Sequence, residues 1–379
     1  MRAARSKPRL LFLVTEDWAF CSHRLATAQA AKEAGYEVWV ATRVNKHGQL
    51  ISKDGFHLVP ICMQRSSLDL KSQWQAISEL IRLYRIIQPD IVHHVAMKPI
   101  LYGSIAAFMA HVPAVVNMVT GLGFIFTDEG AKAYALRAIV QLAIRSMGRK
   151  ERSCLILQNT DDARLFMEQR AAPDDRIRLI RGSGVDIAHF QPLPEPNGKP
   201  TVAIASRMLR DKGIIELVEA VRILHKEGLD IRVILAGSLD RLNPSCLCEQ
   251  DIRTWEKDGL VEWWGEVADI RTVWMQAHIA ALPSYREGLP KSLLEAAACG
   301  RALVATDVPG CREITRNGEN GLLVPARDAV ALAAALRQLV ENPALRQSMG
   351  SRGREIVEKE FSVERVVNET LAVYQELLA

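Results

Sequence analysis

This sequence of 379 residues lacks several features that would define a class of protein. It has no apolar run long enough to span a membrane, and the apolar stretch at residues 10–14 is too short for the core of a signal peptide. Its seven cysteines are odd in number and scattered, which argues against a disulfide framework. It also has no Asp-x-Asp pair, the usual carboxylate holder of a metal-bound diphosphate. We therefore expect a cytoplasmic protein with reduced thiols and with no metal or other cofactor.

The charged residues are unevenly distributed. Residues 1–190 hold 25 Lys and Arg against 17 Asp and Glu, a net charge of +8. The remaining residues hold 23 against 27, a net charge of −4. The basic first half predicts an anionic surface among its partners, and no feature indicates a nucleic acid.

Short apolar segments alternate with helical patterns along the chain. In the first half we expect strands at 10–14, 37–41, 91–95 and 114–119, and helices near 25–34, 73–87 and 101–110. In the second half we expect strands at 202–205, 231–236, 261–264, 279–282 and 302–306, and helices near 215–226, 270–277, 290–298 and 329–341. This alternation predicts an α/β protein with two doubly wound, Rossmann-like domains, 1–190 and 201–357. The segment 191–200 contains four prolines and is the predicted linker, so a ligand would bind between the domains at the carboxyl ends of their strands.

The stretch 283–295, Pro-Ser-Tyr-Arg-Glu-Gly-Leu-Pro-Lys-Ser-Leu-Leu-Glu, is the most informative part of the sequence. It follows an apolar strand; Gly288 permits close backbone approach, and Pro290 suits the first turn of a helix. A strand, a glycine turn and a helix N-terminus together form an anion site. Glu287 precedes this site, and Glu295 lies in an otherwise apolar helix, where a carboxylate needs a donor such as a sugar hydroxyl. The alternative is that Glu287 only interacts with the helix dipole and that Glu295 is a solvated surface residue. The pattern favours a nucleotide-sugar pocket over this alternative.

A second cluster follows the strand at 202–205. Arg207 comes directly after this strand, and Lys212 follows five residues later, before Gly213. Two cations at the end of a strand could bind a diphosphate, although strand–helix loops commonly hold solvated Arg and Lys as well. Facing an anion-binding helix N-terminus, they would neutralise the leaving-group charge that a metal ion otherwise takes.

Polar groups also stand at strand ends in the first half, where an acceptor could bind. A histidine within a strand is more often a buried core residue than a catalytic one, so that alternative stays open for two of them. The candidates on the acceptor side are Glu16, Asp17, His93, His94, Lys98, Gly121 and Gly123.

The segment 132–152 contains six cations and one acid. Polar residues at four-residue spacing form one stripe beside a broad apolar face, which suits a helix lying at a membrane interface. A core helix with a solvated stripe fits the pattern equally well. The candidate membrane contacts are Arg137, Arg145, Arg149 and Lys150.

These motifs together resemble those of the GT-B glycosyltransferases of family 4. The resemblance rests on Glu287 and Glu295 in Glu-Gly-Leu-Pro…Leu-Leu-Glu-Ala-Ala-Ala-Cys-Gly and on the downstream Val-Pro-Gly…Glu-Ile…Asn-Gly…Gly-Leu-Leu-Val-Pro. It also includes Arg207…Lys212-Gly213 and Gly184-Val-Asp186…Phe190, and with the motifs of the first half it covers nearly the whole chain. In the first half, Ser22-His23-Arg24-Leu25, His93-His94…Lys98-Pro99 and Thr120-Gly-Leu-Gly123-Phe look like enzymes that extend lipid-linked sugars for bacterial surface polysaccharides.

The resemblance implies a retaining, metal-independent sugar transfer. Arg207 and Lys212 would bind the diphosphate and act in catalysis with Glu287, which would contact the donor sugar, and Glu295 would bind the ribose; the other donor-binding candidates are Ser284, Gly288, Leu289 and Pro290. The donor would be a UDP-sugar bound to the second domain. The acceptor would be a polyprenyl-diphosphate-linked saccharide bound to the first domain, at the inner face of the cytoplasmic membrane. The family also implies that the last helix, within 358–379, packs back on the first domain.

Two alternatives remain at this stage. A nucleotide-sugar epimerase shares this architecture and would need a similar donor site. A non-catalytic scaffold of a polysaccharide assembly complex is the other alternative, although the intact Glu287, Arg207, Lys212 and Glu295 argue against it.

Overall fold

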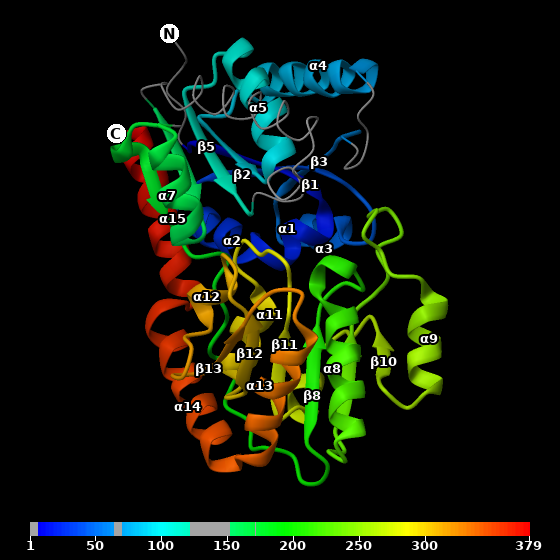
Figure 1. Ribbon diagram of the computed structural model, residues 1–379. Coiled ribbons are helices and arrows are strands. Elements are labelled where there is room, and N and C mark those ends of the chain that lie inside the picture. The colour runs from blue at the N-terminus through cyan, green and yellow to red at the C-terminus, as the bar shows by residue number, and fades with distance from the viewer. Residues whose placement is uncertain (1–6, 64–69, 122–151, 171) are drawn as a thin grey trace. The chain divides into compact units, whose positions relative to one another are not determined.

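The computed structural model describes residues 7–63, 70–121, 152–170 and 172–379 (Figure 1). The chain divides into two compact units. Unit 1 comprises Met1–Ser183 together with Glu364–Ala379, and unit 2 comprises Gly184–Val363. The C-terminal segment therefore belongs to the same unit as the N-terminal half of the chain.

Unit 1 is built on a parallel sheet of seven strands in the order β3-β2-β1-β4-β5-β6-β7. The chain starts at β1, adds strands on one side and then continues from β4 on the other, so the strand order reverses between β1 and β4. Such a reversal is where open α/β sheets bind ligands. The strands are β1 (Arg9–Glu16), β2 (Glu37–Arg43), β3 (His57–Pro60), β4 (Ile91–Val95), β5 (Ala114–Val119), β6 (Ser153–Leu157) and β7 (Ile177–Leu179).

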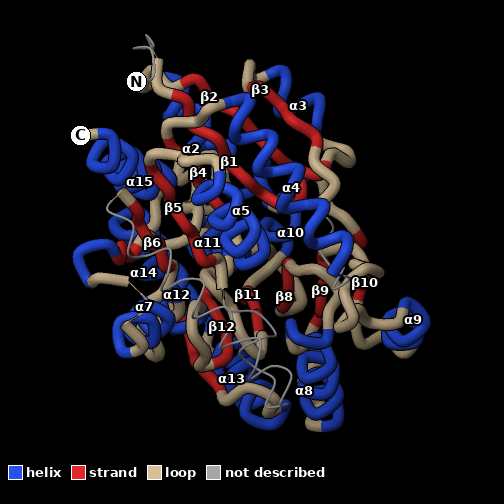
Figure 2. Tube along the Cα trace, turned by 90° about the horizontal axis from the view of Figure 1, so that it is seen from above, coloured by secondary structure: helices blue, strands red, loops and turns tan. Residues whose placement is uncertain are grey.

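Helices cover both faces of this sheet, as Figure 2 shows. Because side chains alternate along β1, Leu11 and Leu13 pack in a core with α4 and α5, and Leu10 and Phe12 pack in the opposite core. The last helix, α15, contributes Val366, Val373, Tyr374 and Leu377 to that opposite core. The helices are α1 (Asp17–His23), α2 (Leu25–Glu33), α3 (Gly48–Lys53), α4 (Leu70–Ile87), α5 (Met97–Met109), α7 (Thr160–Glu168), α15 (Val363–Leu378) and the short η2 (Asp174–Arg176).

Unit 2 repeats the plan with six parallel strands in the order β10-β9-β8-β11-β12-β13, and the order reverses between β8 and β11. The strands are β8 (Thr201–Ala205), β9 (Arg232–Ala236), β10 (Glu262–Gly265), β11 (Ile279–Leu282), β12 (Ala302–Thr306) and β13 (Gly321–Val324). The helices are η3 (Arg210–Lys212), α8 (Ile214–Lys226), α9 (Glu249–Lys257), α10 (Arg271–Gln276), α11 (Lys291–Ala298), α12 (Cys311–Ile314), α13 (Ala329–Glu341) and α14 (Pro343–Glu360).

The proline-rich segment 191–200 lies within unit 2. The Leu193 amide donates to the Cys299 carbonyl at 3.1 Å, and the Glu195 carboxylate pairs with the Arg346 guanidinium at 2.7 Å. Proline restricts φ but leaves carbonyls and neighbouring side chains able to pack, so a proline-rich composition does not by itself separate a segment from a domain. The change of unit occurs earlier, between Ser183 and Gly184.

Candidate functional site

The loops after β8 and β11 meet at the strand reversal of unit 2. Lys212, after β8, forms an ion pair with the Glu287 carboxylate, which follows β11. The Ser284 hydroxyl donates to the same carboxylate at 2.7 Å. The structure thus joins three residues of the predicted donor site from two separate motifs.

Two glycines allow these loops to approach closely. Gly213 has a φ of +69°, and a Cβ at this position would lie 2.0 Å from the Pro283 carbonyl oxygen. Gly310 has a φ of +82°, and its Cβ would lie 2.6 Å from the Gly288 carbonyl oxygen. Any side chain at either position would push the Glu287 loop away from its neighbours.

Helix α11 starts directly after this loop. Gly288 is buried and Leu289 half-buried, and both lead into Pro290. Pro290 is the N-cap residue, with extended backbone (φ −75°, ψ 110°), rather than a member of the first turn as expected from the sequence. Helix α11 begins at Lys291, four residues after Glu287, so the positive end of the helix dipole follows directly on the loop that pairs with Lys212.

Glu295 is buried within α11, with 8% of its surface exposed. Its nearest cation is the Lys291 ammonium, 3.5 Å away and one turn earlier in the helix. Burial raises the pKa of the Glu295 carboxyl, and Lys291 offsets only part of this shift. A buried carboxylate with one cation partner can accept further hydrogen bonds, as from a pair of sugar hydroxyls.

Arg207 forms an ion pair with Asp240, which follows β9. The segment containing Asp240 wraps around the cation loop, because the Met208 amide donates to the Ser238 carbonyl at 3.0 Å and the Arg210 amide to the Ser245 carbonyl at 2.8 Å. Asp240 was not among the residues predicted from the sequence. The available signal was its place after the strand next to β8, since the ends of adjacent parallel strands meet at one edge.

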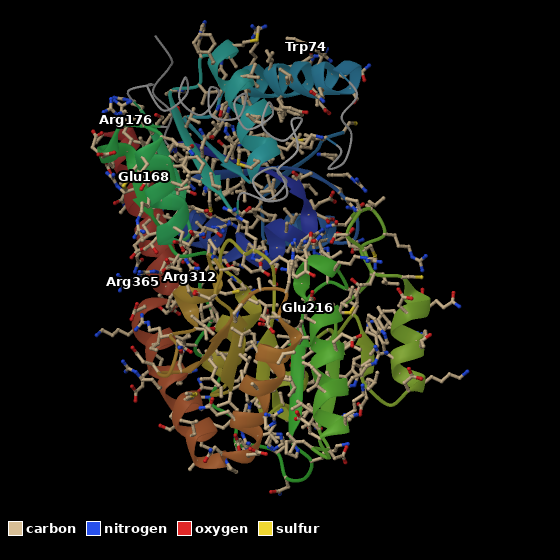
Figure 3. All side chains as sticks on the ribbon, viewed as in Figure 1. Trp74, Glu168, Arg176, Glu216, Arg312 and Arg365 are labelled. Carbon is tan, nitrogen blue, oxygen red and sulfur yellow. The ribbon has the colours of Figure 1, made fainter. Side chains whose placement is uncertain are left out.

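Tyr285 and Glu216 form a second contact between the two loops that sequence analysis missed. The Tyr285 hydroxyl donates to Glu216 at 2.7 Å, and the Tyr285 amide donates to the Asp211 carbonyl at 2.9 Å. Burial and the neighbouring carboxylate raise the pKa of Tyr285 to about 12. Figure 3 marks Glu216 on α8, immediately beyond the Lys212 loop. This contact fixes the Glu287 loop to α8.

In unit 1, the carboxylates at the end of β1 are used within the fold. Asp17 is fully buried and accepts the amides of Asn45 at 2.6 Å and His47 at 2.8 Å. Glu16 accepts from the Asn45 side chain at 3.0 Å. Glu16 and Asp17, which were predicted to bind the sugar acceptor, therefore stabilise the loop that follows β2.

His93 and His94 lie in β4 and are fully buried. His93 Nδ1 lies 2.5 Å from the Tyr374 hydroxyl, whereas His94 contacts Asn117 at 2.8 Å and the Tyr84 hydroxyl at 3.1 Å. Burial lowers the pKa of His94 to about 4 and that of His93 well below its ordinary value. Both imidazoles are neutral core groups at neutral pH, which is the alternative left open above.

Lys98 stands at the start of α5, after β4. Its ammonium lies 5.5 Å from the Tyr102 ring centroid, and burial lowers its pKa. Gly121, which follows β5, has a φ of +130°. The other candidates of this half lie outside the described residues: Gly123, Arg137, Arg145, Arg149 and Lys150.

The part of the chain that the structure describes bears on metal sites and membrane-spanning helices only through its own side chains and helices. Within it, no group of three or more His, Cys, Asp or Glu side chains could hold a metal ion. None of the helices described there has the length and apolarity needed to cross a membrane.

Comparison with known proteins identifies the family in both halves. Residues 9–156 match the family model described as "Glycosyl transferase 4-like". Residues 199–342 match the one described as "Glycosyl transferases group 1". The two matches thus cover the first and the second half of the chain separately.

Curated relatives and a solved structure agree with this assignment. The chain is 27% identical to the Campylobacter jejuni N,N'-diacetylbacillosaminyl-diphospho-undecaprenol alpha-1,3-N-acetylgalactosaminyltransferase, over 90% of this chain and 92% of that protein. It is 23% identical to the Escherichia coli UDP-Gal:alpha-D-GlcNAc-diphosphoundecaprenol alpha-1,3-galactosyltransferase, over 85% and 84%. The structure of Anabaena HepE in complex with UDP and glucose superposes with a TM-score of 0.78 at 17% identity, over 97% and 100%. The chain therefore belongs to the group 1, or family 4-like, glycosyltransferases, which are retaining and metal-independent enzymes, and it has their GT-B fold.

Proposed function

We propose that this glycosyltransferase moves a sugar from a UDP-sugar to a polyprenyl-diphosphate-linked saccharide. The observation that supports this most directly is the Lys212–Glu287 pair at the strand reversal of unit 2, in the loop that leads into α11. Two relatives are named for transfer to diphospho-undecaprenol-linked sugars, and one similar structure contains UDP and glucose. The relatives support the proposed acceptor class, and the geometry of the loops supports the proposed donor site.

In this proposal Arg207 and Lys212 bind the donor diphosphate, and Glu295 accepts hydrogen bonds from the ribose hydroxyls. Glu287 contacts the donor sugar near its anomeric carbon, while Ser284 orients the Glu287 carboxylate. Residues 288–290 bring the backbone close to the phosphates. Asp240 and Glu287 already neutralise the two cations, so the diphosphate replaces or shares these partners when it binds.

Retention follows from reaction on a single face of the sugar. The bond between the anomeric carbon and the diphosphate oxygen breaks as the acceptor oxygen bonds to that carbon from the same side. The acceptor hydroxyl proton passes to the departing diphosphate oxygen. The protein then supplies positive charge to the leaving group, and Glu287 acts by electrostatics and orientation, not as a covalent nucleophile.

An acceptor of this class would bring the enzyme to the inner face of the cytoplasmic membrane. Three apolar side chains of unit 1 suit such a surface, because Trp74, Ile86 and Phe108 are 65%, 71% and 76% exposed on α4 and α5. Arg82 and Arg85 are exposed on α4 as well, which complements anionic lipid. Figure 3 marks Trp74 on α4. The membrane contacts expected at Arg137, Arg145, Arg149 and Lys150 stay a prediction.

The test is transfer of radiolabelled sugar from UDP-sugars into an organic-extractable product, with a polyprenyl-diphosphate N-acetylhexosamine as acceptor. Lys212→Ala and Glu287→Ala should each lower kcat by about 10²–10³-fold, the size seen when one transition-state contact is removed. Lys226→Ala, at the exposed end of the same α8, is the matched control. Melting curves identify any variant whose loss reflects unfolding, since each substitution leaves a charged partner behind.

The same assay distinguishes the alternatives. Activity should persist in EDTA; loss restored by magnesium would contradict a leaving group neutralised by Arg207 and Lys212. Label that changes sugar identity but stays in the aqueous nucleotide fraction would indicate an epimerase. Full turnover in both site variants would overturn the assignment of the site.

A further inference from the structure

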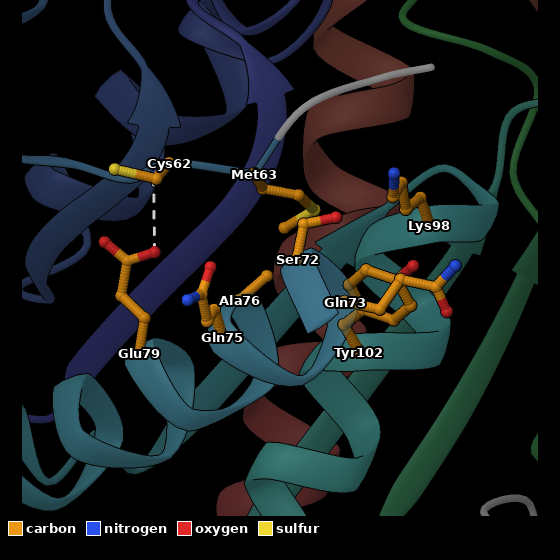
Figure 4. A pocket seen from close by; sticks show the side chains of 9 residues that line it. All are labelled: Cys62, Met63, Ser72, Gln73, Gln75, Ala76, Glu79, Lys98 and Tyr102. Carbon is orange, nitrogen blue, oxygen red and sulfur yellow. Dashed lines mark hydrogen bonds between the residues drawn. The ribbon is translucent and has the colours of Figure 1, made fainter. Parts of the chain in front are cut away.

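Unit 1 contains a pocket of about 360 Å³, and of the residues that line it only Lys98 is among the acceptor-side candidates. It lies where the segment after β3, the first turns of α4 and the first turns of α5 come together, as Figure 4 shows. Because α5 starts at the carboxyl end of β4, the pocket adjoins the strand reversal of this sheet. Its volume is within the range of small-ligand sites.

Six of the nine described residues that line this pocket are Ser, Gln, Glu, Lys or Tyr, and its two charged groups are separated. Lys98 and Glu79 lie at opposite sides of the pocket (Figure 4). Glu79 is held in place because its carboxylate accepts the Cys62 amide at 3.2 Å. Gln73 and Gln75 both project from α4, with the Gln75 amide on the Glu79 side of the pocket and the Gln73 amide on the Lys98 side (Figure 4). The Tyr102 ring lies next to Lys98.

This set of groups matches one ligand class. A single ammonium suits a phosphate, and amide and carboxylate groups together donate to and accept from sugar hydroxyls. An aromatic ring provides a flat apolar surface for the carbon face of a sugar. A pocket that can bind a phosphate at one end and hydroxyls at the other suits a sugar attached to a phosphate.

We infer that this pocket binds the diphospho-sugar end of the acceptor, with Lys98 at the phosphate and Gln73, Gln75 and Glu79 at the sugar hydroxyls. The inference rests on the proposed function, because it specifies where the lipid-linked acceptor binds. It adds Gln73, Gln75, Glu79 and Tyr102 to Lys98. The buried His93 and His94 have no part in it.

Cys62 provides a direct readout, because it lines the pocket and is an exposed free cysteine. The rate of its alkylation by N-ethylmaleimide is followed by peptide mass spectrometry. Farnesyl diphosphate linked to N-acetylglucosamine or to N-acetylgalactosamine should slow the alkylation of Cys62. Exposed Cys248 of unit 2 is the internal control and should be unaffected. No protection by either probe overturns the inference, and equal protection by pyrophosphate or by farnesyl diphosphate alone overturns the sugar assignment.

Variants supply the second measurement. Lys98→Met and Gln73→Ala should each raise the acceptor KM by about tenfold or more, the range of a lost hydrogen bond to a charged or buried polar group. The affinity for UDP, measured by calorimetry, should not change. Lys53→Met, an exposed lysine of α3 in the same unit, is the matched control. An unchanged acceptor KM in both variants contradicts the inference.

Failure of the inference can be told from failure of the proposed function. One outcome would refute the acceptor pocket and leave the proposed function intact. In it, sugar is transferred to the lipid-linked acceptor, but Cys62 is not protected and the two variants keep the wild-type acceptor KM. Protection of Cys62 without any sugar transfer would support the pocket as a binding site and refute the proposed function.

Discussion

Glu287 and Glu295 belong to one motif but have different electrostatic settings. Glu287 is half-buried and is held by an ammonium and a hydroxyl, so its charge is compensated before any ligand binds. Glu295 is buried at the centre of an apolar helix, with one cation at 3.5 Å. The charge of the first residue is therefore compensated by two partners, whereas burial raises the pKa of the second and Lys291 offsets only part of that shift, a perturbation that is common at binding sites.

Replacing Glu295 with Gln should separate stability from binding. Burial raises the pKa of Glu295, so the folded chain binds this proton more tightly than the unfolded chain does. Ionisation of Glu295 therefore destabilises the fold, and this loss develops as the pH rises from the ordinary carboxyl pKa through the raised one. Glu295→Gln removes that cost, and its melting temperature at pH 7 should equal or exceed that of the wild type. Its affinity for UDP should fall about tenfold, since the charged acceptor is lost.

The exposed Glu341→Gln in α13 is the control and should change neither quantity. Calorimetric titration with UDP and thermal melts at pH 5 and pH 7 provide the measurements. A variant that melts lower at pH 7 yet binds UDP normally would make Glu295 a structural residue.

Among the elements, α15 is far from the rest of unit 1 in the sequence but completes the core on one face of its sheet. Tyr374 is fully buried, and its hydroxyl lies 2.5 Å from His93 Nδ1. His93 Nε2 has no partner among the described residues. Tyr374→Phe would therefore leave both ring nitrogens of a buried imidazole without a hydrogen bond to the protein, and we expect the free energy of unfolding to fall by about 1–3 kcal/mol.

Tyr36→Phe is the matched control, because Tyr36 is also buried, its ring lies 6.0 Å from that of Tyr374, and its hydroxyl has no hydrogen bond to a described residue. Chemical denaturation measures both variants. Equal losses would mean that the hydroxyl–imidazole contact contributes nothing beyond packing.

Most elements could be predicted from apolar patterning alone. Four strands occur at the bounds expected from the sequence, because each is a short, fully buried run between turn residues: β4, β5, β11 and β12. Three missed strands are edge strands of three or four residues that are partly exposed: β3, β7 and β13. β6 is fully buried but follows a segment expected to be helical, and apolar periodicity does not distinguish a buried strand from a helix.

The candidate site could be predicted only in part. Lys212 and Glu287 are 75 residues apart, and their meeting follows from the general rule that ligands bind where the strand order reverses. Asp240 and Glu216 were missed, since which side chain meets Arg207 or Tyr285 depends on the course of a loop rather than on sequence pattern. The burial of Asp17 was also missed, because a charged residue at a strand end is usually solvated.

At the scale of the whole molecule, the two units differ in how the chain completes them. Unit 2 is one continuous segment, 184–363, whereas unit 1 needs the separate segment 364–379. Removing that segment takes Val366, Val373 and Tyr374 out of the unit 1 core. At about 1.5–3 kcal/mol for each buried apolar side chain, the combined loss approaches the whole stability of a domain.

Separate expression of the units tests this asymmetry. The fragment 184–363 should unfold cooperatively and bind UDP as the full chain does, whereas 1–183 should show no cooperative unfolding. The chain passes between the units twice, at Ser183–Gly184 and at Val363–Glu364. A Cβ at Gly184 would lie 2.6 Å from the Val363 Cα, so these two points lie side by side, and a short Gly/Ser linker can join Ser183 to Glu364. That fusion should restore a cooperative transition, and the same fusion with Val366→Asp should not. Cooperative unfolding of 1–183 alone would show that α15 covers a core that is already complete.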